Sequence, residues 1–211
     1  MIKVHTFIVE GFDENCYCLV NEKNHALIVD PGGQGNQIIA WIESHEWIPQ
    51  AVILTHAHMD HIGALDEVRD YFQIKAYIHE IEADYISDGR LNLSSYLLNY
   101  DIVQRSAEHL WQMEGLKRID DFEFEIRHVP GHSPGSIVYI FSADKFVIAG
   151  DTLFNGSIGR TDFPGGSLNT LLSGIKHKLL SLTDEYKIYP GHGPMSDIGT
   201  ERRENQFLIQ D

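Results

Sequence analysis

Residues 52–63, VILTHAHMDHIG, place four side chains that can bind a metal within six positions. They are three histidines and one aspartate, His56, His58, Asp60 and His61. Neutral imidazole and carboxylate are common ligands of zinc and similar divalent ions. His56 and His58, two positions apart in an extended stretch, can face one ion. A turn directly after His58 would aim Asp60 and His61 at a neighbouring position. The cluster therefore predicts a metal site.

Three further candidate ligands each follow an apolar, strand-like run elsewhere in the chain. They are His132 in PGHSPG, Asp151 in FVIAGD and His192 in YPGHGP. One carboxylate can ligate two cations and lower their mutual repulsion, so the seven groups divide into two sites that share Asp151. Any one of these residues alone would be read as an ordinary polar loop residue. The local cluster favours metal binding, because so many polar groups near a core are costly without a cation.

The other histidines and the two cysteines give weaker signals. Seven histidines show no clustering in the sequence and are expected to be surface or capping residues: His5, His25, His45, His79, His109, His128 and His177. Cys16 and Cys18 lie two positions apart in a strand-like run and point to the same face. They are expected to be small core residues rather than a disulfide.

The apolar pattern predicts the elements that must position the candidate ligands. Strand-like runs are IKVHTFIV, CYCLV, HALIVD, AVILT, IKAYIH, FEFEIRHV, SIVYIF, KFVIAG and YKIYP, with GFDEN and NEKN read as turns. Apolar residues recur at helical spacing over 36–46, 62–72 and 168–179, and a short helix is expected near the C-terminus. Residues 80–116 are expected to be mostly helical or irregular. Strands and helices thus occur twice in succession, which predicts two α/β halves with sheet packed on sheet and helices outside.

Composition limits the partners. The chain has 211 residues, 43% of them hydrophobic, and a formal net charge of −15. Nucleic acids and anionic membranes attract Lys/Arg-rich surfaces, so neither is expected as a partner. The N-terminal residues lack the apolar run of a signal peptide, and no segment approaches the length of a membrane span. A cytoplasmic protein is expected.

The motif THAHMDH resembles the HxHxDH signature of the metallo-β-lactamase superfamily, and LIVDPGG resembles that family's early Asp-Pro-Gly element. With His132, Asp151 and His192 in order, the resemblance covers most of the chain. It implies one domain over residues 1–211 with an αββα sandwich, two mixed β-sheets packed face to face with helices outside. It also implies two divalent ions, zinc in the first place with iron or manganese as alternatives. The implied ligands are His56, His58 and His132 for one ion, Asp60, His61 and His192 for the other, and Asp151 as the bridge.

Within the superfamily, GDTLFNGSIGRTDFPGG and the closing GHGP…IGTERRENQF are most similar to glyoxalase II-like hydrolases. The C-terminal helical domain of full-length glyoxalase II, which supplies much of its glutathione contact, is not expected in the short stretch after His192. The resemblance implies a thioesterase of the hydroxyacylglutathione hydrolase type with a small-molecule thioester substrate. A hydroxide bridging the two ions would attack the carbonyl, and Asp60 would orient it. Whether glutathione is the thiol stays open.

Several other residues are candidates for supporting roles. Asp30 and Thr55 are expected to hydrogen-bond the ligand histidines from behind, with a turn before Pro31 as the alternative role for Asp30. Residues of the Gly-rich loop that can line a substrate pocket are Ser157, Arg160 and Phe163. For Arg160, an ion pair with Asp162 that holds this loop is the favoured alternative.

Two rival functions stay open. Persulfide dioxygenases of the same superfamily resemble this chain, including a GRTDF-like loop, and bind a single iron. A non-catalytic metal-binding module is the other rival. β-Lactamases that use a cysteine ligand are set aside, because neither cysteine lies near the motif. The sequence gives no oligomeric state.

Overall fold

The computed structural model describes residues 1–209. The chain divides into two compact units, Met1–Gln112 with Ile119–Asp121, and Met113–Arg118 with Phe122–Asp211. Each unit is built on one six-stranded mixed sheet. Within residues 1–209, no helix has both the length and the apolar character needed to cross a membrane.

The sheet of the first unit has the strand order β1-β2-β3-β4-β5-β6. Its strands are β1 (Lys3–Val9), β2 (Glu14–Val20), β3 (His25–Val29), β4 (Ile48–Ile53), β5 (Lys75–His79) and β6 (His109–Trp111). The first three strands form an antiparallel meander, and β3 to β6 pair in parallel. Parallel neighbours need crossover connections, and the chain crosses over through helices.

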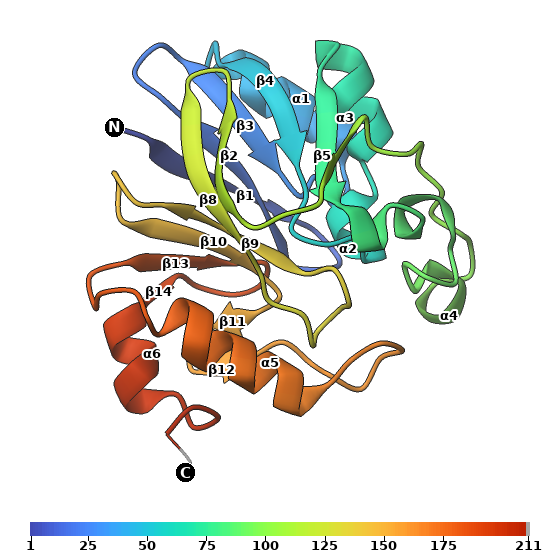
Figure 1. Ribbon diagram of the computed structural model, residues 1–211. Coiled ribbons are helices and arrows are strands. Elements are labelled where there is room, and N and C mark those ends of the chain that lie inside the picture. The colour runs from blue at the N-terminus through green and yellow to red at the C-terminus, as the bar shows by residue number, and fades with distance from the viewer. Residues whose placement is uncertain (210–211) are drawn as a thin grey trace. The chain divides into compact units, whose positions relative to one another are not determined.

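Helices α1 (Gly35–Ser44) and α3 (Leu65–Phe72) lie together on this sheet (Figure 1). Ile38 and Ile42 of α1 and Leu65 and Val68 of α3 are fully buried in one apolar cluster with strand residues. Cys16 and Cys18 are buried free thiols in the same cluster, so their predicted role as small core residues is confirmed.

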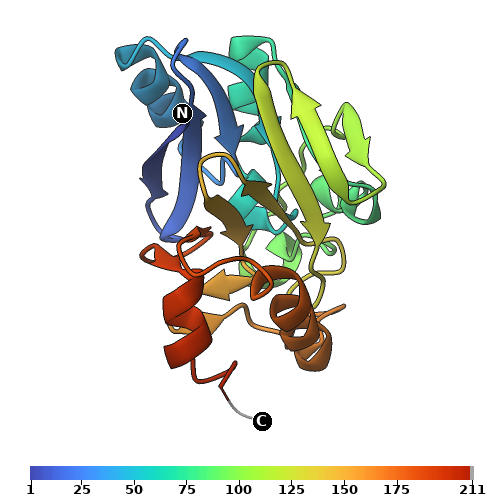
Figure 2. The same ribbon diagram turned by 60° about the vertical axis from the view of Figure 1, so that its left-hand side comes forward.

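The sheet of the second unit has the order β14-β13-β10-β9-β8-β7. Its strands are β7 (Gly115–Ile119), β8 (Phe122–His128), β9 (Ile137–Phe141), β10 (Phe146–Gly150), β13 (Lys187–Pro190) and β14 (Ser196–Asp197). A hairpin of β11 (Leu153–Phe154) and β12 (Ser157–Ile158) lies near α5 (Leu168–Gly174) and α6 (Ile198–Glu204) (Figure 2). A π-helical turn, η3 (Ile175–Leu179), extends α5. Leu171, Ile175 and Ile198 join Leu153 in the apolar cluster of this unit.

One local prediction is confirmed and two need correction. Residues 80–116 are mostly irregular or in the short helices η1 (Glu80–Glu82), η2 (Tyr85–Ser87) and α4 (Ser94–Leu97), as predicted, while β6 and the start of β7 were not foreseen. These edge strands are too short to show an alternating pattern. The helix expected over 62–72 begins earlier, as α2 (Met59–Ile62), and breaks before α3. The turn read in GFDEN ends at Asp13, and Glu14 is already paired in β2.

Candidate metal centre

The first donor set follows the buried end of β4. Residues 56–58 lie outside helix and strand, with extended backbone at His58, and Met59–Ile62 form the helical turn α2, so this motif is only partly the loop that the sequence predicted. The two nitrogens His56 Nε2 and His58 Nδ1 lie 3.1 Å apart. Asp60 Oδ2 and His61 Nε2 are 3.9 Å apart. Each pair therefore presents two donor atoms to one point.

Asp30 lies behind this set and holds two of its members. Its Oδ1 accepts a hydrogen bond from the Thr55 amide at 2.8 Å, and its Oδ2 accepts from Thr55 Oγ1 at 2.6 Å. His61 Nδ1 is 3.0 Å from Asp30 Oδ2, and His56 Nδ1 is 3.1 Å from Thr55 Oγ1. A carboxylate on Nδ1 fixes the tautomer of His61, which makes Nε2 the nitrogen that can act as a ligand atom. Asp30 and Thr55 thus lie where the sequence placed them, although their effect on a metal stays a prediction.

The backbone at Asp30 shows how tightly this contact is specified. Its φ is 46°, in the left-handed region that residues other than glycine rarely adopt. Aspartate tolerates this region better than most residues, and the cost is of order 1–2 kcal/mol. The hydrogen bonds to Thr55 and His61 offset that cost. The alternative role of Asp30 as a turn former before Pro31 is therefore compatible with its contacts to the metal motif.

The surroundings of His61 are negative. Glu14 is fully buried, and its Oε1 lies 3.9 Å from His61 Nδ1. Burial raises the pKa of the nearby Cys16 thiol well above its usual value, and the charges of Glu14, Cys18 and Asp30 raise it further. Two buried acidic side chains behind one histidine favour a cation in front of it.

Gly32 explains why the DPGG segment precedes the motif. A Cβ atom at Gly32 would lie 1.7 Å from the backbone oxygen of Asp60. Only glycine lets these two backbone segments approach so closely. Gly63 also lies close to Gly32, since a Cβ atom at Gly63 would lie 2.2 Å from Gly32 O. The helical conformation is interrupted at this point, between α2 and α3.

The second donor set follows three strands of the other sheet. β10 and β13 are parallel with Gly150 opposite Pro190, so Asp151 and His192 leave neighbouring strand ends. The Gly191 amide donates to Gly150 O at 2.8 Å and continues the pairing past the strands. Asp151 Oδ2 lies 3.6 Å from His192 Nε2 and 3.5 Å from His132 Nε2. One carboxylate oxygen thus stands between two imidazoles.

His132 is oriented by the Gly-rich loop. Its Nδ1 donates to the backbone oxygen of Arg160 at 2.8 Å, which leaves Nε2 towards Asp151. A Cβ atom at Gly159 would lie 1.9 Å from Asp151 O and 3.2 Å from His132 Cβ. The loop therefore packs directly against both donors, and its glycine is required by that approach.

The donor spacings fit divalent cations. A tetrahedral ion with nitrogen ligands at 2.0–2.1 Å places neighbouring donor atoms about 3.3–3.4 Å apart. Within the first unit the His56–His58 spacing is 3.1 Å, and within the second unit the His132–Asp151 spacing is 3.5 Å. Imidazole nitrogen and carboxylate oxygen suit zinc, iron and manganese alike.

The three residues proposed for a substrate pocket all lie in the second unit. The guanidinium of Arg160 pairs with Asp162 at 2.7 Å and lies 3.9 Å from the ring centroid of Phe163. This is the ion pair favoured from the sequence, and Arg160 reaches His132 through its backbone oxygen. The hydrogen bond from Arg160 lowers the pKa of Asp162 to about 2. Ser157 begins β12, and its backbone oxygen accepts from Asn205 Nδ2 at 3.0 Å.

The family model described as the metallo-beta-lactamase superfamily matches residues 9–192. The chain belongs to the metallo-β-lactamase superfamily. Similar proteins include the probable metallo-hydrolase YqgX of Bacillus subtilis, 44% identical over 92% of both chains. The hydroxyacylglutathione hydrolase GloC of Haemophilus influenzae is 36% identical over 95% of both chains. Family membership supports a metal-dependent hydrolase.

Solved structures of the superfamily match the fold. A crystal structure of BLEG-1 B3 metallo-beta-lactamase has a TM-score of 0.97 at 40% identity, over 99% of this chain and 100% of that one. A structure of TTHA1623 in a di-iron-bound form has a TM-score of 0.86 at 31% identity, over 97% and 100% of the two chains. The predicted fold class, the αββα metallo-β-lactamase sandwich with two mixed sheets and helices outside, is confirmed.

Two buried acids near the first donor set were missed from the sequence. Glu14 was read as part of a turn, and Glu82, whose Oε2 accepts from the Ala57 amide at 2.6 Å, lies in a stretch with no recognisable pattern. The family resemblance identifies ligands by spacing, whereas these partners come from distant elements. No local signal in the sequence distinguishes these two acids from the other acidic residues.

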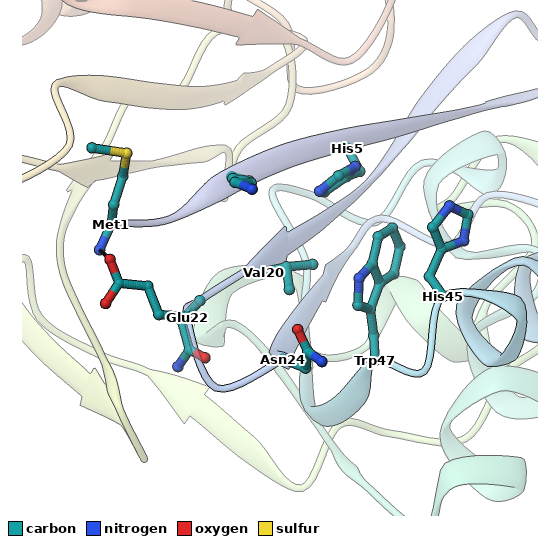
Figure 3. Close-up of a pocket in the computed structure, with 9 residues that line it drawn as sticks. Met1, His5, Val20, Glu22, Asn24, His45 and Trp47 are labelled. Carbon is teal, nitrogen blue, oxygen red and sulfur yellow. Dashed lines mark hydrogen bonds and ion pairs between the residues drawn. The ribbon is translucent and has the colours of Figure 1, made fainter.

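His5 is partly buried, and His45 is exposed and is the C-cap residue of α1, as predicted. Their rings lie 4.6 Å and 4.5 Å from Trp47, at the edge of a cavity of ≈ 480 Å³ in the first unit (Figure 3). Burial and the neighbouring His45 lower the pKa of His5. Among residues 1–209, neither histidine belongs to a group of three donors close enough to share an ion. His79 is a capping residue as predicted, since it accepts from the Ile81 amide at the start of η1.

Proposed function

We propose that this chain hydrolyses small-molecule thioesters as a metal-dependent enzyme of the hydroxyacylglutathione hydrolase type. The observation that carries the proposal is the 36% identity to GloC, which extends over 95% of both chains. In this proposal the two donor sets serve one pair of ions. His56, His58 and His132 hold the first, Asp60, His61 and His192 hold the second, and Asp151 contacts both.

The two ions would supply Lewis acidity, which lowers the pKa of water to near neutral and polarises the thioester carbonyl. The chain's own residues would orient the reactants. Asp60 is partly exposed beside His61 and would orient the attacking hydroxide by accepting a hydrogen bond from it. Asp30 keeps Nε2 of His61 available by holding Nδ1. A thiolate is a good leaving group, so no dedicated acid is needed.

Zinc is the first candidate metal, and iron or manganese are alternatives. The di-iron-bound form of TTHA1623, 31% identical, supports iron. Histidine and carboxylate donors accept all three, so metal availability decides. Ser157, Arg160 and Phe163 remain proposed pocket residues. The cytoplasmic location and the absence of nucleic-acid and membrane partners remain predictions.

β-Lactam hydrolysis is a second candidate function. The structure of BLEG-1 B3 metallo-beta-lactamase, 40% identical with a TM-score of 0.97, favours it. The sequence argument set aside only those β-lactamases that use a cysteine ligand, so it does not exclude β-lactamases as a class. The two activities differ in leaving group, since an amide nitrogen needs a proton that a thiolate does not.

The deciding experiment measures turnover of S-D-lactoylglutathione by protein loaded with zinc, manganese or iron(II). Nitrocefin hydrolysis and oxygen uptake with glutathione persulfide are measured in parallel. Asp60→Asn should abolish thioester turnover, and Asp13→Asn, which changes an exposed aspartate of the β1–β2 turn, should not. Turnover of nitrocefin alone would favour the β-lactamase. Oxygen uptake alone would favour the dioxygenase and overturn the proposal.

A further inference from the structure

Two backbone amides that flank His58 are held by the same distant stretch of chain. The Ala57 amide donates to Glu82 Oε2 at 2.6 Å. The Met59 amide donates to Asn92 O at 2.9 Å. Both acceptors come after β5, Glu82 from the end of η1 and Asn92 from the residues before α4. The backbone of the HxH motif is therefore fixed from outside the motif.

The burial and charge of Glu82 suit it to accept the hydrogen bond from the Ala57 amide. Its side chain is fully buried, although burying a carboxyl group is costly unless it is hydrogen-bonded. A short bond from a backbone N–H to a carboxylate is of the stronger, charge-assisted kind. The short helix that presents Glu82 is itself capped by His79, which accepts from the Ile81 amide at 3.3 Å. Burial, followed by the charge of Glu82, raises the pKa of the neighbouring Tyr85.

The stretch that holds the motif is fixed in turn by its own hydrogen bonds. Asn92 Nδ2 donates to Ile102 O at 2.8 Å, and Asn92 Oδ1 accepts from Ser94 Oγ at 2.7 Å. Gln104 Nε2 donates to Gly63 O at 2.9 Å, just past the motif. The stretch thus contacts the motif region at Ala57, Met59 and Gly63, and only one of these contacts uses an acidic side chain.

We propose that Glu82 is a positioning residue that sets the spacing between the His56 and His58 donor atoms. This rests on the metal centre of the proposed function. Ala57 joins the two histidines, so rotation of its peptide would move both imidazoles and change their 3.1 Å spacing. The bond to Glu82 prevents that rotation before any ion binds. Glu82 acts through the backbone and contacts neither ion nor substrate.

The test compares Glu82→Gln and Glu82→Asp with Glu108→Gln. Glu108 is an exposed control that also pairs with Arg69, and its Oε2 accepts the Ala76 amide at 2.7 Å in the same unit. Divalent-ion affinity is measured by competition with a chelator. Amide hydrogen exchange at Ala57 is measured by NMR in metal-free protein. Circular dichroism confirms the fold.

Glu82→Gln should bind divalent ions about tenfold more weakly, in line with the loss of other supporting contacts at metal sites. Exchange at the Ala57 amide should accelerate, and Glu108→Gln should change neither quantity. Glu82→Asp keeps the charge but shortens the reach, so it should also weaken binding. Wild-type affinity in Glu82→Gln, or unchanged exchange at Ala57, would overturn the proposal.

The remaining outcomes are also decisive. Loss of the fold in Glu82→Gln would make Glu82 a core residue and overturn its positioning role. Wild-type protein that binds metal without hydrolysing thioesters would overturn the proposed function and leave the role of Glu82 intact. Wild-type protein that binds no divalent ion would overturn both.

Discussion

The two donor sets are built in opposite ways. The first compresses His56, His58, Asp60 and His61 into six positions after β4, and distant side chains hold it from behind. The second takes one donor from each of three strand ends, and its spacing follows from the pairing of β10 with β13. A compact motif has many backbone conformations and needs outside partners to select one. A set delivered by paired strands has its geometry fixed by the sheet.

Because the two donor sets are held differently, they should be sensitive to different substitutions. Only three side chains are needed to hold every donor of the first set except Asp60, through hydrogen bonds to the histidines or to their backbone. They are Asp30, Thr55 and Glu82. In the second set, His132 is held by a backbone group, through the bond from its Nδ1 to the Arg160 oxygen. Side-chain substitutions should therefore damage the first set, whereas backbone-disrupting substitutions should damage either.

Replacing the shared carboxylate tests the second set most severely. Asp151→Ala removes the oxygen that lies 3.5 Å and 3.6 Å from the two histidines. Loss of a supporting partner alone costs 10–100-fold in metal affinity, so loss of a ligand should cost more than about 100-fold. Metal content by elemental analysis and affinity by chelator competition would check this. Retention of two tightly bound ions would contradict the role of Asp151.

Adding a methyl group at the close backbone approaches tests both sets alike. Gly32→Ala and Gly159→Ala would place Cβ 1.7 Å and 1.9 Å from the backbone oxygens of Asp60 and Asp151. Such overpacking should lower the free energy of unfolding by about 3 kcal/mol in each variant. Thermal unfolding of metal-free protein measures the loss. Gly11→Ala, with φ 90° and open space, should show backbone strain alone and a smaller loss. Equal losses in all three would contradict the steric explanation.

Neutralising Asp30 tests the outside support of the first set. Asp30→Asn removes the charge that accepts from Thr55 and faces His61 Nδ1. Divalent-ion affinity should fall 10–100-fold, because the tautomer and basicity of His61 are no longer fixed. Asp66→Asn, which alters another aspartate of the first unit that accepts a backbone amide, should leave affinity unchanged. A fall of the same size in both variants would point to general charge rather than to His61.

The smallest expected effect concerns the exposed ion pair of the second unit. Arg160 holds the pKa of Asp162 at about 2, below its usual value of 3.8. A lowered pKa in the folded state stabilises the fold above pH 4, and the contribution disappears as the pH falls from about 4 to about 2. Because the pair is exposed, the stabilisation should be slight. Unfolding midpoints of wild type and Asp162→Asn should differ slightly at pH 5 and coincide at pH 2. An NMR-measured Asp162 pKa near 3.8 would contradict the pairing.

Secondary structure was predicted best where the sequence signal is local. Alternating and continuous apolar runs located nine strands close to their observed bounds, and helical spacing located α1 and α5. The short edge strands β6 and β7 were missed, because three to five residues carry too little pattern. The histidine motif was found because its members are neighbours in the chain.

The sequence by itself predicted the candidate donors, since residue type and spacing are sufficient to recognise a ligand motif. Asp30 and Thr55 were expected behind those donors, but tertiary structure alone decided that Glu14 and Glu82 lie there too. These two acids come from separate elements and meet the motif only after β2 and β5 are in place. Contacts between residues far apart in the chain depend on strand pairing and helix packing together, and no local pattern records them.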